Sequence, residues 1–191
     1  MRRLHLRAAV KALAVAALIA AVGCGHQGAP VAASAAPIAT ARLRNTTYQL
    51  AFDPTRTLHL VNGAATDGSE LEGTMVISTT MLDTIARGTL PDGRASAAVV
   101  LVTEAGGTGS FYDLALVADS SGTLTDLATV GLGDRVVVRH IRLYADSVAV
   151  TLVTQGPKDP MCCPTLEVTR HFVLDGGRLI PTDRTSAVDS K

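Results

Sequence analysis

Two adjacent cysteines, Cys162 and Cys163, have the most distinctive chemistry in this sequence. A neighbouring pair of thiols can close on itself as a disulfide, act as a redox switch, or bind a soft metal ion such as Cu(I) or zinc. Met161 would add a thioether ligand to such a metal site, and His171 and His140 are the histidines in strand-like segments. Disulfide formation, redox switching and metal binding are therefore three competing hypotheses for this pair.

Cys24, the third cysteine, follows a segment typical of export signals. Residues 1–11 are basic, and residues 12–22 form an uncharged apolar run. In a helix this run would span about 16 Å, roughly half a hydrocarbon core, which predicts a signal peptide rather than a transmembrane helix. Ala21-Val22-Gly23-Cys24 resembles the lipobox of bacterial lipoproteins. The resemblance implies cleavage before Cys24, a diacylglycerol on its sulfur and an acyl chain such as palmitate on its amine.

Composition divides the chain into four parts. Residues 1–23 are the predicted lipoprotein signal peptide. Residues 24–41 comprise the lipidated cysteine and a flexible tether rich in Ala, Gly, Pro and Ser. Residues 42–183 are expected to form a single β-rich extracytoplasmic domain, followed by a disordered tail over residues 184–191. Cleavage before Cys24 removes four bases from a chain with 17 bases and 17 acids, which leaves a net charge of −4. Such a charge argues against nucleic acid as a partner.

The disulfide hypothesis follows from the expected compartment. Disulfides form outside the cytoplasm, where Cys162 and Cys163 have only each other as intrachain partners once Cys24 is lipidated. Their Cα atoms are about 3.8 Å apart across a trans peptide, which is shorter than the usual span of a disulfide. Pro160 and Pro164 restrict the backbone on both sides. We therefore expect a rigid loop that controls the approach to the following strand.

Period-two patterns and closely spaced turn residues predict a mainly β fold, an antiparallel sheet or sandwich with at most short helices. Strands are expected over residues 47–52, 58–61, 74–79, 97–103, 111–118, 135–144, 148–154, 166–174 and 178–180. The continuous apolar run at residues 97–103 predicts a central strand buried on both faces. Met81 to Arg87 is the segment expected to form one or two helical turns. On period two, His171 shares the polar face of its strand with Glu167 and Thr169.

Five motifs occur in order between residues 87 and 180: Ala97–Leu101, Gly106–Tyr112, Leu132–Val136, Gly156–Thr165 and Val168–Arg170. Together they resemble a family of uncharacterised bacterial secreted proteins and lipoproteins, and the Asp-Pro-Met-Cys-Cys-Pro-Thr run is the most specific of them. The resemblance implies an extracytoplasmic protein and brings no established activity. Relatives often carry an Asp-rich loop suited to calcium, but here Asp92 is the only acid in residues 87–93, so no calcium site is expected.

The sequence contains no pattern typical of a catalytic centre. Ser110, Asp113, His140 and His171 are available for nucleophilic hydrolysis, but no nucleophile elbow orders them. The glycine-rich loop Gly106–Gly109 lacks the lysine and the following helix of a phosphate-binding loop, and we expect it to provide positive φ or a close backbone approach. We therefore expect no cofactor and no enzyme activity.

These observations predict a lipid-anchored bacterial envelope protein. Gly25 follows Cys24 where an inner-membrane retention signal would often be Asp, which favours the outer membrane, facing the periplasm, in a host with two membranes. The expected role is a non-catalytic structural or interaction module with an unidentified envelope protein as partner. The loops Gly106–Gly109 and Pro157–Pro164 are its most distinctive surfaces. The alternatives are a redox-switch or soft-metal-binding protein that uses the cysteine pair, and an enzyme of unrecognised type.

Overall fold

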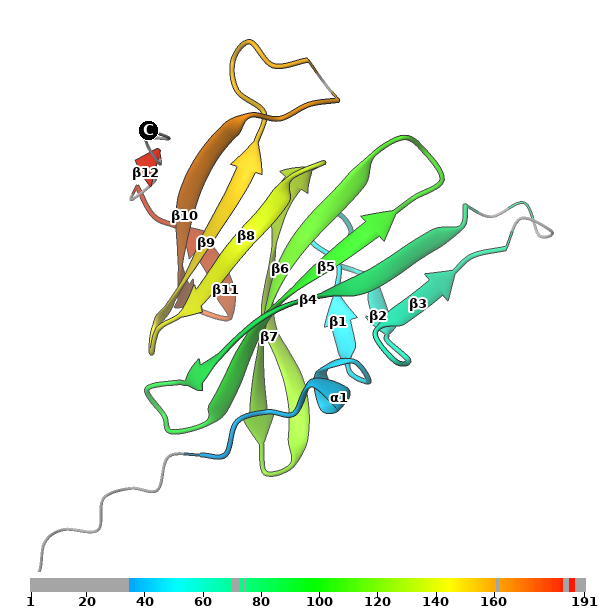
Figure 1. Cartoon of the computed structure of the whole chain (residues 1–191). Coiled ribbons are helices and arrows are strands. Elements are labelled where there is room, and N and C mark those ends of the chain that lie inside the picture. Colours follow the sequence, from blue (N-terminus) through cyan, green and yellow to red (C-terminus); the bar gives the residue numbers. More distant parts are fainter. Residues whose placement is uncertain (1–34, 70–72, 74, 161, 184–185, 188–191) are drawn as a thin grey trace, which may run out of the picture. The chain divides into compact units, whose positions relative to one another are not determined.

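The predicted mainly β fold is confirmed. A computed structural model describes residues 35–69, 73, 75–160, 162–183 and 186–187, which belong to one folded unit (Figure 1). In this part of the chain, two five-stranded antiparallel sheets and a two-stranded ribbon account for the strands. Helix is confined there to the four residues of α1 (Thr40–Leu43).

Each sheet is antiparallel throughout. The first sheet has the order β3 (Ala64–Asp67), β4 (Ile77–Thr89), β5 (Ala95–Glu104), β6 (Ser110–Ser120) and β7 (Thr123–Asp134). The second has the order β8 (Val137–Leu143), β9 (Ser147–Thr154), β10 (Leu166–Asp175) and β11 (Arg178–Pro181), with β12 (Ser186–Ala187) also paired to β10. The ribbon consists of β1 (Thr47–Gln49) and β2 (Thr57–His59).

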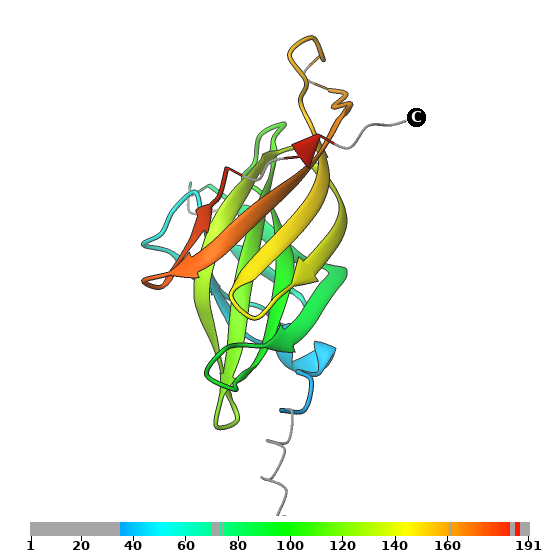
Figure 2. The same ribbon diagram turned by 90° about the vertical axis from the view of Figure 1, so that its left-hand side faces the viewer.

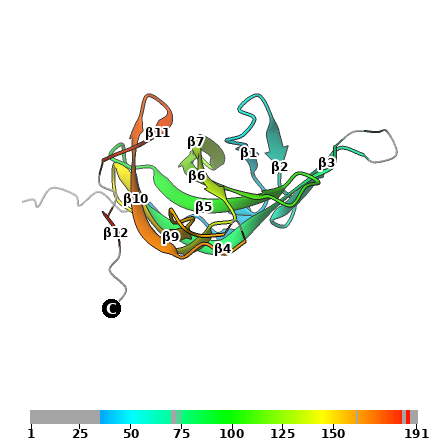
Figure 3. The same ribbon diagram turned by 90° about the horizontal axis from the view of Figure 1, so that it is seen from above.

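The main hydrophobic core lies between the two sheets. Alternate side chains of the central strands point into it, among them Val100, Leu114, Leu116, Val150, Leu152 and Phe172. The sheets also approach each other along their edges, because β4 contacts β8 and β11 contacts β7. Seen from above, the strands curve around this core (Figure 3).

The first sheet has a second core on its other face. There α1, the ribbon and the segment before them cover β5 and β6, and the buried residues include Ile38, Leu43, Tyr48, Leu60, Val99, Leu101 and Val117. The Tyr48 hydroxyl donates a hydrogen bond of 2.8 Å to the Leu43 carbonyl and so fixes the end of α1 on the sheet. Residues 97–101 of β5 are fully buried, which confirms the predicted strand covered on both faces.

The packed structure begins earlier than predicted, since the tether was expected to continue to Ala41. Ile38 is only 1% exposed, and Arg87 of β4 donates hydrogen bonds to the Ile38 carbonyl (2.8 Å) and the Thr40 hydroxyl (2.6 Å). One isoleucine among small residues is too weak a pattern to reveal this anchor. The predicted signal peptide, Cys24 and most of the tether lie outside the described residues.

The helix predicted at Met81–Arg87 was wrong, because these residues belong to β4. The pairing of β4 with β5 shifts register between Met81 and Ile85, which marks a β-bulge. The bulge breaks the alternation of the strand and leaves apolar residues at 81, 82, 85 and 86, a spacing that imitates one face of a helix.

Three strands were missed. The pattern gave no signal for β3 or for β7, whose pairing with β6 shifts register twice and therefore hides the period of two. The third is β12, which falls inside the predicted disordered tail: its two residues pair with Val168 and Thr169 of β10. Two residues are too few to produce a pattern. They form a strand because the backbone of β10 is available for pairing at this position.

Candidate functional site

The connections between strands fall into two groups at opposite ends of the sheets. The turns at residues 90–94, 121–122, 144–146 and 176–177 lie at one end, which we call the proximal end. The segment Ala35–Pro37 reaches the fold here, since it lines a pocket together with Asp92, Gly93 and Gly122. The described part of the chain therefore begins at the proximal end.

The two loops singled out from the sequence both lie at the other end, which we call the distal end. It contains the β5–β6 loop at residues 105–109 and the β9–β10 loop at residues 155–165. Figure 2 shows the β9–β10 loop at one end of the sheets and the blue α1 at the other. The ten residues of β5 run between the two ends and span about 30 Å.

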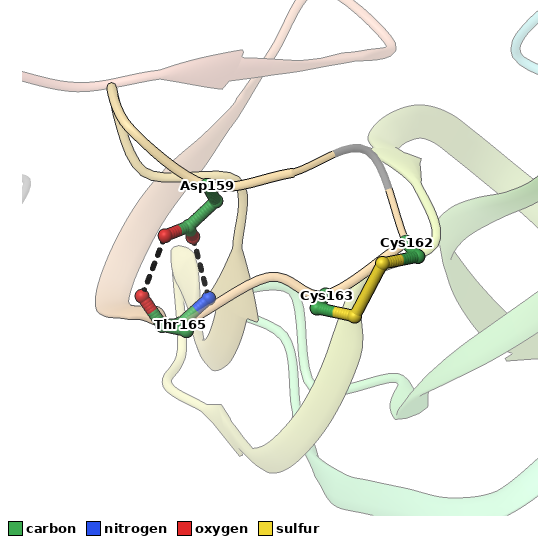
Figure 4. Close-up of a disulfide and its surroundings, with 4 residues drawn as sticks. All are labelled: Asp159, Cys162, Cys163 and Thr165. Carbon is green, nitrogen blue, oxygen red and sulfur yellow. Dashed lines mark hydrogen bonds between the residues drawn. A yellow bond between two sulfur atoms is a disulfide. The ribbon is translucent and has the colours of Figure 1, made fainter.

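Asp159 closes the base of the β9–β10 loop. Its Oδ2 accepts hydrogen bonds from the backbone N–H groups of Gly156 (2.7 Å) and Thr165 (2.6 Å), and its Oδ1 accepts one from the Thr165 hydroxyl (2.8 Å; Figure 4). Gly156 and Thr165 stand at the two ends of the loop, so one carboxylate ties these ends together. The same hydrogen bonds lower the pKa of the Asp159 carboxyl, because they stabilise its ionised form.

Cys162 and Cys163 lie at the exposed tip of this loop and are joined to each other as a disulfide (Figure 4). Their Cα atoms are 3.8 Å apart, as expected for neighbours. The Cys163 N–H donates a hydrogen bond of 3.0 Å to the Pro160 carbonyl, which closes a turn around the pair. Met161 lies outside the described residues.

The β5–β6 loop is also held in place. Gly106 has a φ of +72°, a left-handed conformation that glycine adopts without strain, in agreement with the predicted role of these glycines. The guanidinium of Arg135, which follows β7, donates hydrogen bonds of 3.1 and 2.6 Å to the Thr108 carbonyl. The β7–β8 connection therefore supports the glycine loop directly.

His171 and His140 line one pocket with each other and not with the cysteines. They line a polar pocket of about 360 Å³ on the outer face of the second sheet, together with Arg142, Tyr144, Thr151 and Thr169. His171 is five residues along β10 from Leu166, about 16 Å from the end of the β9–β10 loop. Within the described residues, no three His, Cys, Asp or Glu side chains are grouped as metal ligands. The histidines therefore give no support to a metal site at the cysteines.

Two acids that the sequence reasoning did not connect hold the ribbon on the first sheet. Asp126 of β7 accepts a hydrogen bond from the Gln49 N–H (2.9 Å), and Asp113 of β6 accepts one from the Ala51 N–H (3.1 Å). Burial raises the pKa of both carboxyls, and these hydrogen bonds offset only part of that rise. For Asp113 a signal existed, because on period two it shares a face with the fully buried Ala115 and Val117.

Asp113 also lines an open pocket at the distal end. The pocket has a volume of about 320 Å³, and its walls include Ala51, Phe52, Phe111, Gly131 and Gly133. The Phe52 and Phe111 rings lie 6.2 Å apart between centroids and are tilted by 38°. Both rings keep much of their surface exposed, 44% and 40% respectively.

Comparisons of the chain with family models, with curated proteins and with solved structures gave no match. The resemblance to bacterial secreted proteins and lipoproteins therefore remains a prediction. No helix in the described part of the chain is long and apolar enough to cross a bilayer.

Proposed function

We propose that the protein is a lipid-anchored envelope protein that acts as a non-catalytic interaction module through its distal end. The observation that carries this proposal is the position of the N-terminal segment. Ala35–Pro37 lies at the proximal end, about 30 Å along β5 from the loops of the distal end. A tether that starts at a lipidated Cys24 would therefore leave the distal end facing away from the membrane.

The structure of the distal loops supports a role in recognition. Asp159 ties the base of one loop, and Arg135 holds the backbone of the other at Thr108. A loop that is already ordered loses little conformational entropy when it binds, so more of its contact energy becomes affinity. Exposed aromatic rings beside such loops are typical of protein contacts.

A redox switch is the second candidate, since the disulfide is exposed at the loop tip and a reductant can reach it. Two electrons and two protons would convert Cys162 and Cys163 to thiols. The hydrogen bonds of Asp159 at the loop base involve neither sulfur and would remain. Reduction would then change only the conformation of the loop tip. A role of the disulfide in shaping a contact surface is therefore favoured over a redox switch that changes the whole domain.

The anchor is tested by metabolic labelling with an alkyne analogue of palmitate in a bacterium that processes lipoproteins. We expect label on the wild-type protein and on the double variant Cys162→Ser/Cys163→Ser, and none on Cys24→Ala. A Cys24→Ala protein that is still labelled, or an unlabelled wild-type protein, would remove the lipid anchor from the proposal.

The interaction role is tested with two charge reversals at exposed positions, Lys158→Glu in the distal β9–β10 loop and Arg178→Glu at the proximal end. The unit from residue 33 onward is added to envelopes from a strain that lacks the protein. We expect saturable binding that Lys158→Glu weakens about tenfold and Arg178→Glu leaves unchanged. Equal effects of the two variants, or binding that does not saturate, would contradict a contact made by the distal end.

A further inference from the structure

We propose that the distal pocket around Asp113 binds a primary alkylammonium group, namely a lysine side chain of a partner protein. This inference deepens the proposed function and rests on it for the source of the ligand. The pocket lies at the same end as the two ordered loops, since Phe111 and Asp134 stand next to Ser110, where β6 begins.

Asp113 lines the pocket, and only one of its two carboxylate oxygens accepts a hydrogen bond from the described residues. The residue is 2% exposed, and its Oδ2 accepts a hydrogen bond from the Ala51 N–H. Among the described residues, Oδ1 has no hydrogen-bond partner, and it lies beside Gly131, where a Cβ would be 3.8 Å away. The lining places no cation beside this carboxylate, so an arriving ammonium would add a charge-assisted hydrogen bond at Oδ1.

Two glycines and a β-bulge create the space above this oxygen. Asp113 pairs with Gly131 and Tyr112 pairs with Gly133, so that Leu132 is the extra residue of β7. Neither glycine carries a side chain that would fill the pocket. β-Bulges are over-represented next to binding sites because they redirect strands and side chains.

The walls of the pocket suit an alkyl chain that ends in a positive charge. The Phe52 and Phe111 rings form an apolar wall that the methylene groups of a lysine can cover, and aromatic faces attract cations. The lining contains two acids and no Lys or Arg. Asp134 is already paired with Arg135 at 2.9 Å, which leaves Asp113 as the carboxylate without a cation.

The geometry distinguishes lysine from other cations. A guanidinium binds best when both oxygens of a carboxylate are available, but Oδ2 of Asp113 already accepts a hydrogen bond from the Ala51 N–H. A quaternary ammonium has no N–H to donate to Oδ1. A primary ammonium can donate one hydrogen bond to Oδ1 while its stem lies against the phenyl rings.

The test is a titration of the unit from residue 33 onward by NMR, with n-butylammonium as the probe. We expect saturable shifts of the Gly131 and Gly133 amide signals, and no saturable shift with n-butanol or tetramethylammonium. Asp113→Asn, which keeps the size of the side chain, should weaken binding about tenfold or more. Gly131→Ala, which places a methyl group beside Oδ1, should weaken it to a similar degree.

Gly107→Ala is the matched control, since a Cβ at this distal glycine would meet nothing within 4 Å. This variant should bind n-butylammonium like the wild-type protein. Unchanged affinity in Asp113→Asn, or no saturation at Gly131, would overturn the proposal. If Asp113→Asn does not fold, as judged by its amide spectrum, the test rests on Gly131→Ala. Weaker binding of n-butylammonium by this variant would support the proposal, and unchanged affinity would overturn it.

A second arm identifies the source of the ammonium. Nα-acetyl-lysine N-methylamide should bind at least as tightly as n-butylammonium if the site accepts a lysine within a protein chain. Binding of n-butylammonium without binding of the lysine derivative would overturn the lysine assignment. Distal binding to envelopes that persists in Asp113→Asn would leave the proposed function standing and refute only this pocket as its contact.

Discussion

The proximal and distal ends are built from the same strands but are completed in different ways. At the proximal end the turns are short, and Arg42 of α1 donates hydrogen bonds to Asp119 near the end of β6 (2.5 Å) and to the Gly122 carbonyl in the β6–β7 turn (2.8 Å). At the distal end the loops are longer, two phenyl rings are exposed and a carboxylate keeps an unused oxygen. At the proximal end an arginine thus pairs with an acid of the same fold, while at the distal end Asp113 has no cation in the lining of its pocket.

The acids of β6 show the same difference. Asp119, near the proximal end, has its pKa lowered, first by the hydrogen bond from Arg42. Asp113, near the distal end, has its pKa raised by burial, since no cation lies beside it. The strand β6 therefore carries one acid that is paired with an arginine and one acid that has no cation beside it.

The largest expected effect is on the attachment of the N-terminal segment. Ile38→Ala removes a side chain that is 1% exposed in the second core, and should lower the free energy of unfolding by about 2–5 kcal/mol. Phe52→Ala, at the distal end, should lower it by about 1 kcal/mol or less, because the ring is 44% exposed. Urea unfolding of both variants checks the difference. Similar losses would mean that the two ends contribute equally to stability.

The next effect is a pH dependence of opposite sign for the two acids. The pKa of Asp113 is higher in the folded protein than in the unfolded chain, where it is near 3.9. The stability of the fold therefore decreases as the pH rises from the unfolded pKa through the folded pKa. A lowered folded pKa means that Asp119 adds stability above its unfolded value, and this is lost as pH falls through its folded value.

The wild-type protein should therefore lose stability between pH 3 and pH 7 through Asp113, and Asp113→Asn should be free of this loss. Asp119→Asn should become less stable at pH 7 with little change at low pH. Carbon-13 titration of the two carboxyls checks the directions. A pKa of Asp113 at or below that of Asp119 would contradict the contrast between the ends.

A smaller, local effect is expected at Asp159. Asp159→Ala removes the acceptor of three hydrogen bonds at the loop base, so the Gly156 and Thr165 amides should exchange with solvent about tenfold faster. The β9 and β10 amides should keep their protection. Hydrogen exchange followed by NMR measures both, and unchanged exchange at Thr165 would show that other contacts order the loop.

The smallest expected effect is that of the cysteines on global stability. A disulfide between neighbours closes no length of chain, so it removes almost no freedom from the unfolded state. Cys162→Ser/Cys163→Ser should change the free energy of unfolding by no more than about 0.5 kcal/mol. A loss of several kcal/mol in thermal or urea unfolding would give the pair a structural role far beyond its loop.

Local patterns in the sequence predicted the regular strands but not the features that depend on three-dimensional pairing. The alternation in β9 and β10 and the apolar run in β5 predicted those strands close to their bounds. The bulges in β4 and β7 broke the period, so β4 contained a false helix and β7 was missed. The positions of these bulges depend on how each strand pairs with its neighbour, which the local sequence does not show.

The candidate site was predictable only in part. The cysteines and the glycine loop stood out because of their residue types, whereas their position at the same end depends on the order of the strands. The hypothesis that His171 serves the cysteines was not supported, since the face and length of β10 place it elsewhere. The Asp113 pocket needs a bulge and two glycines from another strand, and no local pattern indicates that combination.

The most direct test of the central claim is photo-crosslinking in the living cell from one position at each end. A photoreactive amino acid replaces Gly107 in the distal β5–β6 loop or Ala145 in the proximal β8–β9 turn, both of which are exposed. The account predicts a discrete adduct from position 107 that excess soluble domain suppresses, and no such adduct from position 145. An adduct from position 145 alone, or equal adducts from both, would contradict recognition by the distal end.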